Sequence, residues 1–485
     1  MRLKINKSIL LILLLFGAIY CLIALYNHYL FRTYALDLGL YTNAIFKYAH
    51  FRLASSQMIY DYSEPLLGDH FDLYLIILSP IVYILGSYTL PVIQIIAILA
   101  GGLGIYKYFN LNGIRHSFLP IAATLYFLLF FGVYSAISFD YHSNVVAAML
   151  IPWFLILLKQ EKYRLAALLL LLILVAKENM ALWMIFVCSG LMIESRENKK
   201  AVILLSAFAL FSLLYFLAVI YFIIPAFTES GKYNLFSYSI LGHSPADALK
   251  NLFLHPMKYI SNFFTNHTAN PAGDYIKTEM HILVLVSGLY LLLTRPAYLI
   301  MLIPIYLQKA YHDNYQVWGI FGQYSIEFAP VMAIGIFSFI NDLKKKKTAL
   351  WLSALVIAGA ALATFRTMDH SVMYTQKSKI RFYQAAHYSR KYNVKTVYLE
   401  LDKIPSGAAV SAQSPFVPHL ALRDKIYQFP VIKDADYIVL SLNEDKFPLK
   451  EEEFTAKLKE INASGEWEET FSGEGLLVFE KVVSH

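Results

Sequence analysis

The stretch Phe31–Asp72 begins FRTYALDLGLY and ends GDHFD, and it directly follows the apolar run Ser8–His28. It is aromatic and carries acids and histidines but only three basic residues. An apolar run of about 20 residues is long enough to cross a bilayer, so the polar groups after it are expected at the membrane edge. They are functional candidates if they lie in the membrane or in a cavity, and an ordinary amphipathic surface loop is the alternative.

The composition predicts a polytopic membrane protein. Of the 485 residues, 58% are hydrophobic and 15% are charged, whereas a soluble protein has about 25% charged residues. The net charge of +7 does not indicate nucleic-acid binding, because the basic residues lie mostly between apolar runs, where they set topology. Cys21 and Cys188 both fall inside apolar runs, so no disulfide framework is expected.

The first apolar run follows a basic segment, Met1–Lys7, as a signal peptide would. No small-x-small cleavage site follows it and more apolar runs come later, so a retained first helix with its N-terminus inside is expected. Eleven crossings are predicted, several of them shorter than a full span. They lie near residues 8–28, 90–109, 117–137, 144–158, 164–177, 180–193, 201–224, 281–294, 297–311, 326–341 and 349–366.

The apolar stretch 71–86 is short for a crossing and has Pro80 in its middle. The basic connections contain Lys107 and Arg115, Lys159 to Arg164, Arg196 to Lys200, Arg295, and Lys344 to Lys347. These connections all face the cytoplasm together only if 71–86 does not cross. We therefore expect a re-entrant or interfacial helix on the outer side, with the C-terminal region outside. A twelfth crossing is the alternative, and it would place most of the basic loops outside.

With this topology the polar motifs without basic character gather in the outer connections. These connections are 29–89, 138–143, the turn near Lys177–Asn179, 225–280 and 312–325. They contain Asp37, Asp61, Glu64, Asp69, His70 and Asp72, then Asp140 and His142, then Lys177 and Glu178, and finally His312 and Asp313. Separate polar clusters on one face predict a shared cavity, with the loop 29–89 as the candidate active-site loop.

The composition changes near residue 369, which divides a membrane domain (1–368) from a soluble extracytoplasmic domain (369–485). The stretch Lys377–Lys391 is typical of an amphipathic helix and Leu449–Ile461 of a charged one. Four short runs predict strands: Thr396–Leu401, Ala408–Ser411, Tyr437–Leu442 and Leu476–Phe479. Strands that alternate with helices indicate a small α/β domain, and it has no glycine-rich phosphate loop.

Asp37 is the candidate catalytic residue. A carboxylate near the membrane interface acts as a general base when it is partly desolvated, and Gly39 permits close approach of a backbone or ligand. The structural alternative is a helix N-cap for Leu38–Tyr48, and the two roles are compatible.

The other clusters also allow two interpretations each. Asp140 and His142, with His70 and Asp72, are candidate ligands of a divalent metal, although no tight metal-binding spacing is present. The alternative is a polar network that caps helix ends. Lys177 and Glu178 interrupt an apolar run, where charges are costly unless they pair or face water. Lys177 would hold a phosphate and Glu178 would orient it or a hydroxyl, or the two residues form a structural pair.

Four motifs in order carry a resemblance that covers nearly the whole chain: Tyr34–Tyr41, Gly68–Phe71, Phe139–His142 and Ala176–Asn179. Together with Ile404–Ser411, Pro418–Leu420 and Ala435–Ile438, they resemble a family of bacterial and archaeal predicted membrane proteins with a domain of unknown function. Members often carry an acid where this chain has Ser143 and Asn144, and often Asp where it has Asn179.

That family in turn resembles the GT-C type membrane glycosyltransferases, which place a catalytic aspartate in the first outer loop and use polyprenyl-phosphate sugars. The resemblance implies a glycosyltransferase in the cytoplasmic membrane, with Asp37 as the base. It further implies Lys177 or Arg32 at the donor phosphate and His70, Asp72, Asp140 and His142 at the acceptor or metal side. A divalent metal is allowed but not required. The alternatives are a transporter of a lipid-linked glycan or small solute, with Lys177 and Glu178 as a coupling pair, and a non-catalytic scaffold.

Overall fold

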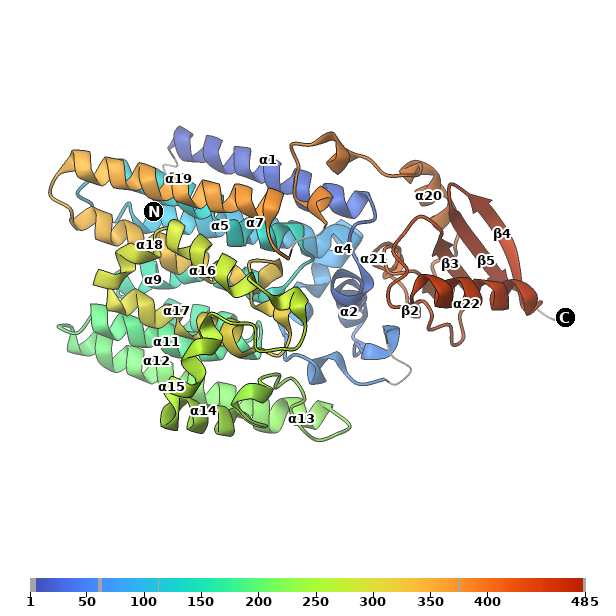
Figure 1. Cartoon of the computed structure of the whole chain (residues 1–485), viewed down its shortest axis with the longest axis horizontal. Helices are drawn as coiled ribbons and strands as arrows, with labels where there is room; N and C mark the ends of the chain where they lie inside the picture. Colours follow the sequence, from blue (N-terminus) through green and yellow to red (C-terminus); the bar gives the residue numbers. More distant parts are fainter. Residues whose placement is uncertain (1–5, 60–62, 112, 374–375, 483–485) are drawn as a thin grey trace.

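The computed structural model describes residues 6–59, 63–111, 113–373 and 376–482. Most of its helices run along the long axis of the molecule, and a small sheet lies at one end (Figure 1). Among these helices are α1 (Lys7–Tyr29), α5 (Thr89–Tyr108), α12 (Lys199–Ala218), α18 (Phe328–Asp342) and α19 (Lys346–His370). The predicted class, a helical membrane domain followed by a small sheet, is confirmed at this level.

Within the described residues, five helical stretches are long and apolar enough to cross a membrane. They are Lys7–Tyr29, Tyr74–Tyr108, Lys199–Phe227, Gly322–Asp342 and Lys346–His370. A sixth is counted if α6 (Leu119–Leu129) and α7 (Phe131–Ser138), which are bent by 43°, form one span. The eleven-crossing arrangement therefore stays a prediction.

The remaining predicted crossings correspond to shorter or interrupted helices. They are α8 (Ser143–Ala148), α9 (Ile151–Lys159), α10 (Tyr163–Leu174), α11 (Glu178–Glu194), α16 (Ile276–Val286) and α17 (Pro296–Tyr311). α10 has 12 residues, which at about 1.5 Å per residue is well short of the roughly 30 Å bilayer core. α16 is followed by Gly288, whose φ is 108°, and by a 3-10 segment, Leu289–Thr294. The described structure therefore has fewer continuous helices of membrane length than the sequence has apolar runs.

The stretch 71–86 forms α3 (Tyr74–Leu78) and α4 (Val82–Leu85), which lead through two 3-10 turns into α5. Pro80 lies in the first turn and Gly86, with φ of 56°, in the second. Both short helices contact α2 (Leu40–Ala49), the helix that follows Asp37. The stretch is thus a broken extension of α5 beside α2, and its predicted interfacial position is not tested by this arrangement.

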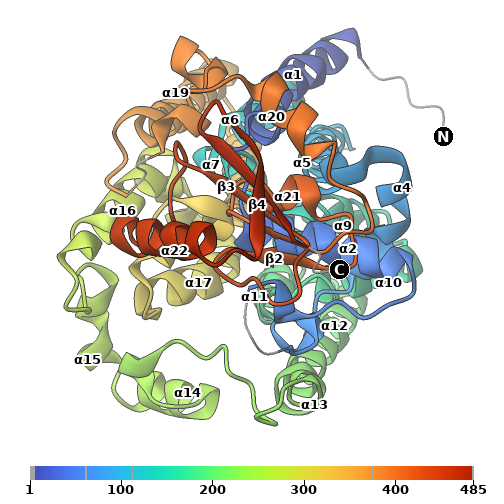
Figure 2. The same ribbon diagram turned by 90° about the vertical axis from the view of Figure 1, so that its right-hand side faces the viewer.

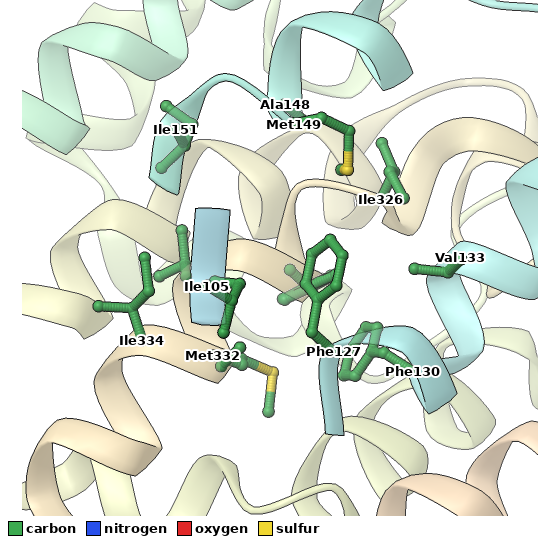
Figure 3. Packing of buried hydrophobic residues seen from close by; sticks show 14 of the residues in the cluster. Ile105, Phe127, Phe130, Val133, Ala148, Met149, Ile151, Ile326, Met332 and Ile334 are labelled. Carbon is green, nitrogen blue, oxygen red and sulfur yellow. The ribbon is translucent and has the colours of Figure 1, made fainter. Parts of the chain in front are cut away.

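The bundle core is apolar and closely packed. Figure 3 shows Ile105, Phe127, Phe130, Met149 and Met332 in one cluster with their neighbours. α11 packs against both α12 and α17. At Gly190 of α11, an added Cβ would lie 2.3 Å from the carbonyl oxygen of Ala297. Glycine therefore permits the close approach of α11 and α17, the helices that follow Lys177 and Arg295.

The C-terminal region forms a five-stranded sheet of order β2-β1-β3-β5-β4. The strands are β1 (Val410–Ala412), β2 (Ile426–Gln428), β3 (Tyr437–Ser441), β4 (Trp467–Gly473) and β5 (Leu476–Lys481). β1 pairs in parallel with β2 and β3, whereas β5 is antiparallel to β3 and β4. The predictions of β3, β5 and the helix α22 (Glu451–Ala463) are confirmed.

Two local predictions are wrong. The stretch Lys377–Lys391 is not an amphipathic helix but contains two 3-10 turns, Lys377–Lys379 and Ala385–Tyr388. Its donors and acceptors are used in contacts with the rest of the protein, described below. The predicted strand Thr396–Leu401 belongs to a helix, α20 (Val394–Leu401). The Asn393 side chain accepts hydrogen bonds from the N–H groups of Lys395 and Thr396, at 3.0 and 3.4 Å, and this N-cap outweighs the β-branched composition.

The sheet and the segment that follows α1 share one hydrophobic core. Phe31, Leu38 and Ala44 of the segment belong to the same buried cluster as Val410 and Val417. α21 (Val417–Leu420) packs on the turn that contains Asp37. The C-terminal domain is therefore continuous in packing with the segment 31–90 and covers it.

Candidate functional site

Asp37 lies in a short π-helix, Ala35–Gly39, between α1 and α2. The N–H of Gly39 donates to the carbonyl oxygen of Tyr34 at 2.9 Å, which gives the wide turn. π-helical turns occur frequently at functional sites, because the extra residue displaces side chains from the regular helix face. An added Cβ on Gly39 would lie 2.9 Å from Val417 Cγ1, so the α21 contact needs glycine here.

The Asp140 carboxylate supports this turn. Its Oδ2 accepts the N–H of Tyr34 at 3.0 Å and the N–H of Leu38 at 3.4 Å. Its Oδ1 faces the Nζ of Lys379 at 3.9 Å. Burial raises the pKa of the Asp140 carboxyl above its ordinary value, and Lys379 opposes this shift. Asp140 thus orients the turn that carries Asp37 and is itself held by a cation from the C-terminal side.

His142 connects the two aspartates. Its backbone N–H donates to Gln94 Oε1 at 2.9 Å, which fixes the segment after α7. Its ring Nε2 lies 3.3 Å from Asp37 Oδ1, and its Nδ1 lies 3.3 Å from the carbonyl oxygen of Asp140. Both ring nitrogens therefore face oxygen atoms, and the imidazole is held in one orientation against Asp37.

The Asp37 side chain is 29% exposed. Burial alone would raise its pKa. His142 beside it, together with the ammonium groups of Lys177 and Lys379, outweighs burial, so the pKa of the Asp37 carboxyl lies below its ordinary value. Asp37 is therefore ionised at neutral pH and partly accessible to solvent.

A small, partly open pocket shares His142 with the Asp37 turn. His70, Asp72, His142, Ser143 and Lys177 contribute to its wall, together with Tyr41, one helical turn after Asp37. The structure thus brings four of the predicted residues to a single pocket. Asp37 is joined to it through His142.

Two acidic side chains of the pocket region are already engaged. Asp72 accepts a hydrogen bond from Ser143 Oγ at 2.5 Å and one from the N–H of Tyr74 at 2.9 Å. Burial raises the pKa of the Asp72 carboxyl to about 6. Glu178, behind the pocket, pairs with His70, whose Nδ1 lies 2.8 Å from Glu178 Oε1.

Lys177 and Arg32, the two candidate phosphate ligands, have different surroundings. Lys177 lines the pocket at the start of α11, and its Nζ makes no hydrogen bond or ion pair within the described residues. The buried guanidinium of Arg32 donates to the carbonyl oxygens of Ser378, Ala386, His387 and Ser389, at 2.6 to 3.4 Å. Arg32 therefore connects the segment after α1 to residues 378–389, while Lys177 lines the pocket.

The predicted metal ligands do not come together as a set. No group of three His, Cys, Asp or Glu side chains within the described part of the chain is arranged to hold a metal ion. His142 is directed at Asp37, Asp140 at two amides and Lys379, and His70 at Glu178. These residues do not fit a shared metal centre, and no step below passes through one.

The residues of this site come from segments spread over more than 300 positions of the chain. A family model described as Predicted membrane protein (DUF2079) matches residues 27–478. The chain belongs to this family. The DUF2079 match includes the Asp37 turn, the pocket and all five strands of the sheet up to Val478. No curated protein matches the chain.

Two residues of this DUF2079 site were not identified from the sequence. Gln94 lies in the middle of an apolar run, where a lone amide needs a buried hydrogen-bond partner. Its position in the sequence therefore indicates a buried polar contact. Lys379 lies in a basic stretch that resembles a solvated helix face. Its Nζ lies 4.9 Å from the centre of the Tyr34 ring, and its burial depends on contacts more than 230 residues away in sequence.

Proposed function

We propose that this membrane protein is a transferase of the GT-C type, which moves a sugar from a polyprenyl-phosphate donor to an acceptor hydroxyl by single inversion. The acceptor oxygen forms a bond to the anomeric carbon, and the bond from that carbon to the phosphate oxygen breaks. The electron pair leaves with the lipid phosphate. The hydroxyl proton passes to the Asp37 carboxylate. One base and a stabilised leaving group account for the whole reaction.

The observation that carries the proposal is the state of Asp37. Its carboxylate is ionised, partly exposed and held 3.3 Å from His142, at the first turn after a membrane-length helix. A general base must be deprotonated and within reach of the proton that it accepts. His142 would stabilise the carboxylate orientation, and Asp140 would hold the turn.

Lys177 supports the other half of the reaction. Lys177 lines the pocket that His142 shares with the Asp37 turn, and its Nζ makes no hydrogen bond or ion pair within the described residues. A cation placed there offsets the negative charge that develops on a departing phosphate. In this proposal Lys177 alone binds the donor phosphate, because the donors of Arg32 are directed at backbone carbonyls.

The proposal includes the finer topology: eleven crossings in the cytoplasmic membrane, with the pocket and residues 369–485 outside. Segregation of charge supports it. The connection Lys344–Lys347 between α18 and α19 lies at the end of the molecule opposite the C-terminal sheet (Figure 1). Basic connections face the cytoplasm, so the sheet and the pocket would face outward.

The test is an assay of purified protein in nanodiscs with a panel of polyprenyl-phosphate sugars and hydroxyl acceptors. Asp37→Asn keeps the shape but removes the proton acceptor, so we expect turnover to fall by roughly 10²–10⁴-fold with donor binding nearly unchanged. Lys177→Ala should mainly weaken donor binding. Asp402→Asn, at an exposed position of the C-terminal domain, is the matched control and should retain full turnover.

Retained turnover in a folded Asp37→Asn protein would contradict the assignment of the base. Loss of folding in that variant would indicate a structural role instead. If no donor of the panel is turned over and none binds in a Lys177-dependent way, the transporter and scaffold interpretations gain support.

A further inference from the structure

Two short helices project from the edge of the bundle. They are α14 (Pro245–Leu254) and α15 (Pro256–Tyr259), and a 3-10 turn, Ile260–Phe263, follows them. Figure 2 shows α13 (Ile224–Phe227), α14 and α15 along one edge of the molecule. Figure 1 shows α14 and α15 at the same level along the long axis as part of α12, rather than beyond its end. We call residues 245–264 the lateral arm.

The lateral arm has an exposed apolar row. Leu249, Phe253, Met257, Ile260 and Phe264 recur every three or four residues, and their exposed fractions are 72, 86, 78, 53 and 63%. Scattered exposed apolar side chains are ordinary on a protein surface, but a contiguous row of large ones marks a contact with another apolar phase.

The other side of the lateral arm is attached to the protein. Ala248 and Tyr259 are buried in a small cluster with Leu241 and Tyr311. Asn251 Nδ2 donates to the carbonyl oxygen of Leu241 at 2.7 Å. The row is therefore the outward face of an anchored element.

Lipid is the occupant that this face fits. The candidate span Lys199–Phe227 ends in α13, which lies along the same edge (Figure 2), and it also has exposed apolar side chains, among them Leu214 at 56% and Phe222 at 74%. Lys250 and Lys258 lie beside the row, and their ammonium groups complement lipid phosphates. The only acid of α14, Asp247, accepts a hydrogen bond from its N-cap Ser244. Amphipathic helices with such faces lie in the boundary between headgroups and acyl chains.

We propose that the lateral arm is embedded in the bilayer, with the row Leu249–Phe264 among the acyl chains. The bilayer then fixes the position of the preceding loop, 228–244. That loop contacts the segment before His70, because the N–H of Glu229 donates to Glu64 Oε1 at 3.0 Å. Its Tyr238 lies in a second pocket with Asn179, the residue after Glu178. The membrane thereby fixes a loop that packs beside these two segments, whatever reaction the site performs.

Spin labels in nanodiscs test this placement. In a Cys21→Ala background, with Cys188 fully buried and unreactive, we would label Phe253→Cys and Met257→Cys, and Glu452→Cys on the exposed face of α22 as the water-facing control. We expect dissolved oxygen to collide several-fold more often than a water-soluble nickel complex at positions 253 and 257, and the reverse at 452. Leu249→Cys is a second position if either variant fails to fold.

Access of the nickel complex to positions 249, 253 and 257 equal to that at 452 would overturn the proposal, because the row would then face water. Labels that are immobile and inaccessible to both reagents would also overturn it, because the row would then be covered by protein, such as a second copy of the chain.

Discussion

At the scale of single residues, Asp72 gives the most direct consequence for stability. Its carboxyl is buried and has a pKa of about 6, against an ordinary value of 3.8. The folded state therefore keeps a proton that the unfolded chain loses, and the free energy of unfolding decreases as the pH rises from about 4 to about 6. A gap of roughly two pKa units corresponds to about 3 kcal/mol.

We predict that Asp72→Asn removes this pH dependence. The thermal midpoint, measured by unfolding in detergent, should be higher for the wild type than for the variant near pH 4. As the pH rises to 7, the midpoint of the variant should rise relative to that of the wild type. Glu452→Gln, at an exposed position, serves as the control and should leave the wild-type profile unchanged. A difference between variant and wild type that is constant from pH 4 to 7 would contradict the pKa assignment.

Lys177 is a candidate because it interrupts an apolar run, whereas Asp37, His70 and His142 belong to polar motifs between predicted crossings. All four residues lie at or beside one pocket. Partners were not identified, because a hydrogen bond depends on distances that no local pattern records. Arg32 shows the limit: a basic residue beside a membrane-length helix fits a phosphate ligand, yet its donors meet four carbonyl oxygens.

At the scale of elements, the segment 377–391 after α19 holds the Asp37 turn in place. Lys379 from this segment faces Asp140, and the pair is buried on both sides. Removing one member of a buried ion pair leaves an uncompensated charge, which typically costs about 3–5 kcal/mol.

We therefore predict that Lys379→Met strongly lowers the thermal midpoint and exposes residues 377–391 to limited proteolysis. The double variant Lys379→Met with Asp140→Asn should recover part of the loss, since it removes the charge left without a partner. Equal stability of the single variant and the wild type would show that the pair is not energetically coupled. A double-mutant cycle measures this term directly.

Elements were predicted well where one periodicity dominates. α1, α19, β3 and α22 follow from long apolar runs or clear alternation. The segment 377–391 was mispredicted because its amphipathic pattern reflects contacts with α1 and the Asp37 turn rather than a helix face. β2 and β4 were not predicted: β2 has three residues, and most of β4 is exposed and polar.

At the scale of the whole molecule, the basic connection Lys344–Lys347 between α18 and α19 and the C-terminal sheet lie at opposite ends (Figure 1). Under the proposed orientation, we predict that alkaline phosphatase fused after Lys481 is active outside the cytoplasmic membrane, whereas a green fluorescent protein at that position is dark. The same reporters inserted between Lys344 and Lys347 should give the opposite pattern. Fluorescence of the C-terminal fusion would place the C-terminus in the cytoplasm and would contradict the proposed orientation.

The hydrophobic core shared by Phe31, Leu38, Val410 and Val417 also has a consequence for biosynthesis. A ribosome makes the Asp37 turn among the first 40 residues, but the strand and helix that cover it appear only some 370 residues later. Contacts this distant in sequence form late, since a long loop must close first. The turn therefore stays without its apolar partner for most of translation. During this time its apolar side chains are exposed, which favours aggregation or proteolysis. A chain that terminates anywhere before β1 would reach the membrane with its helices inserted but its site unfinished.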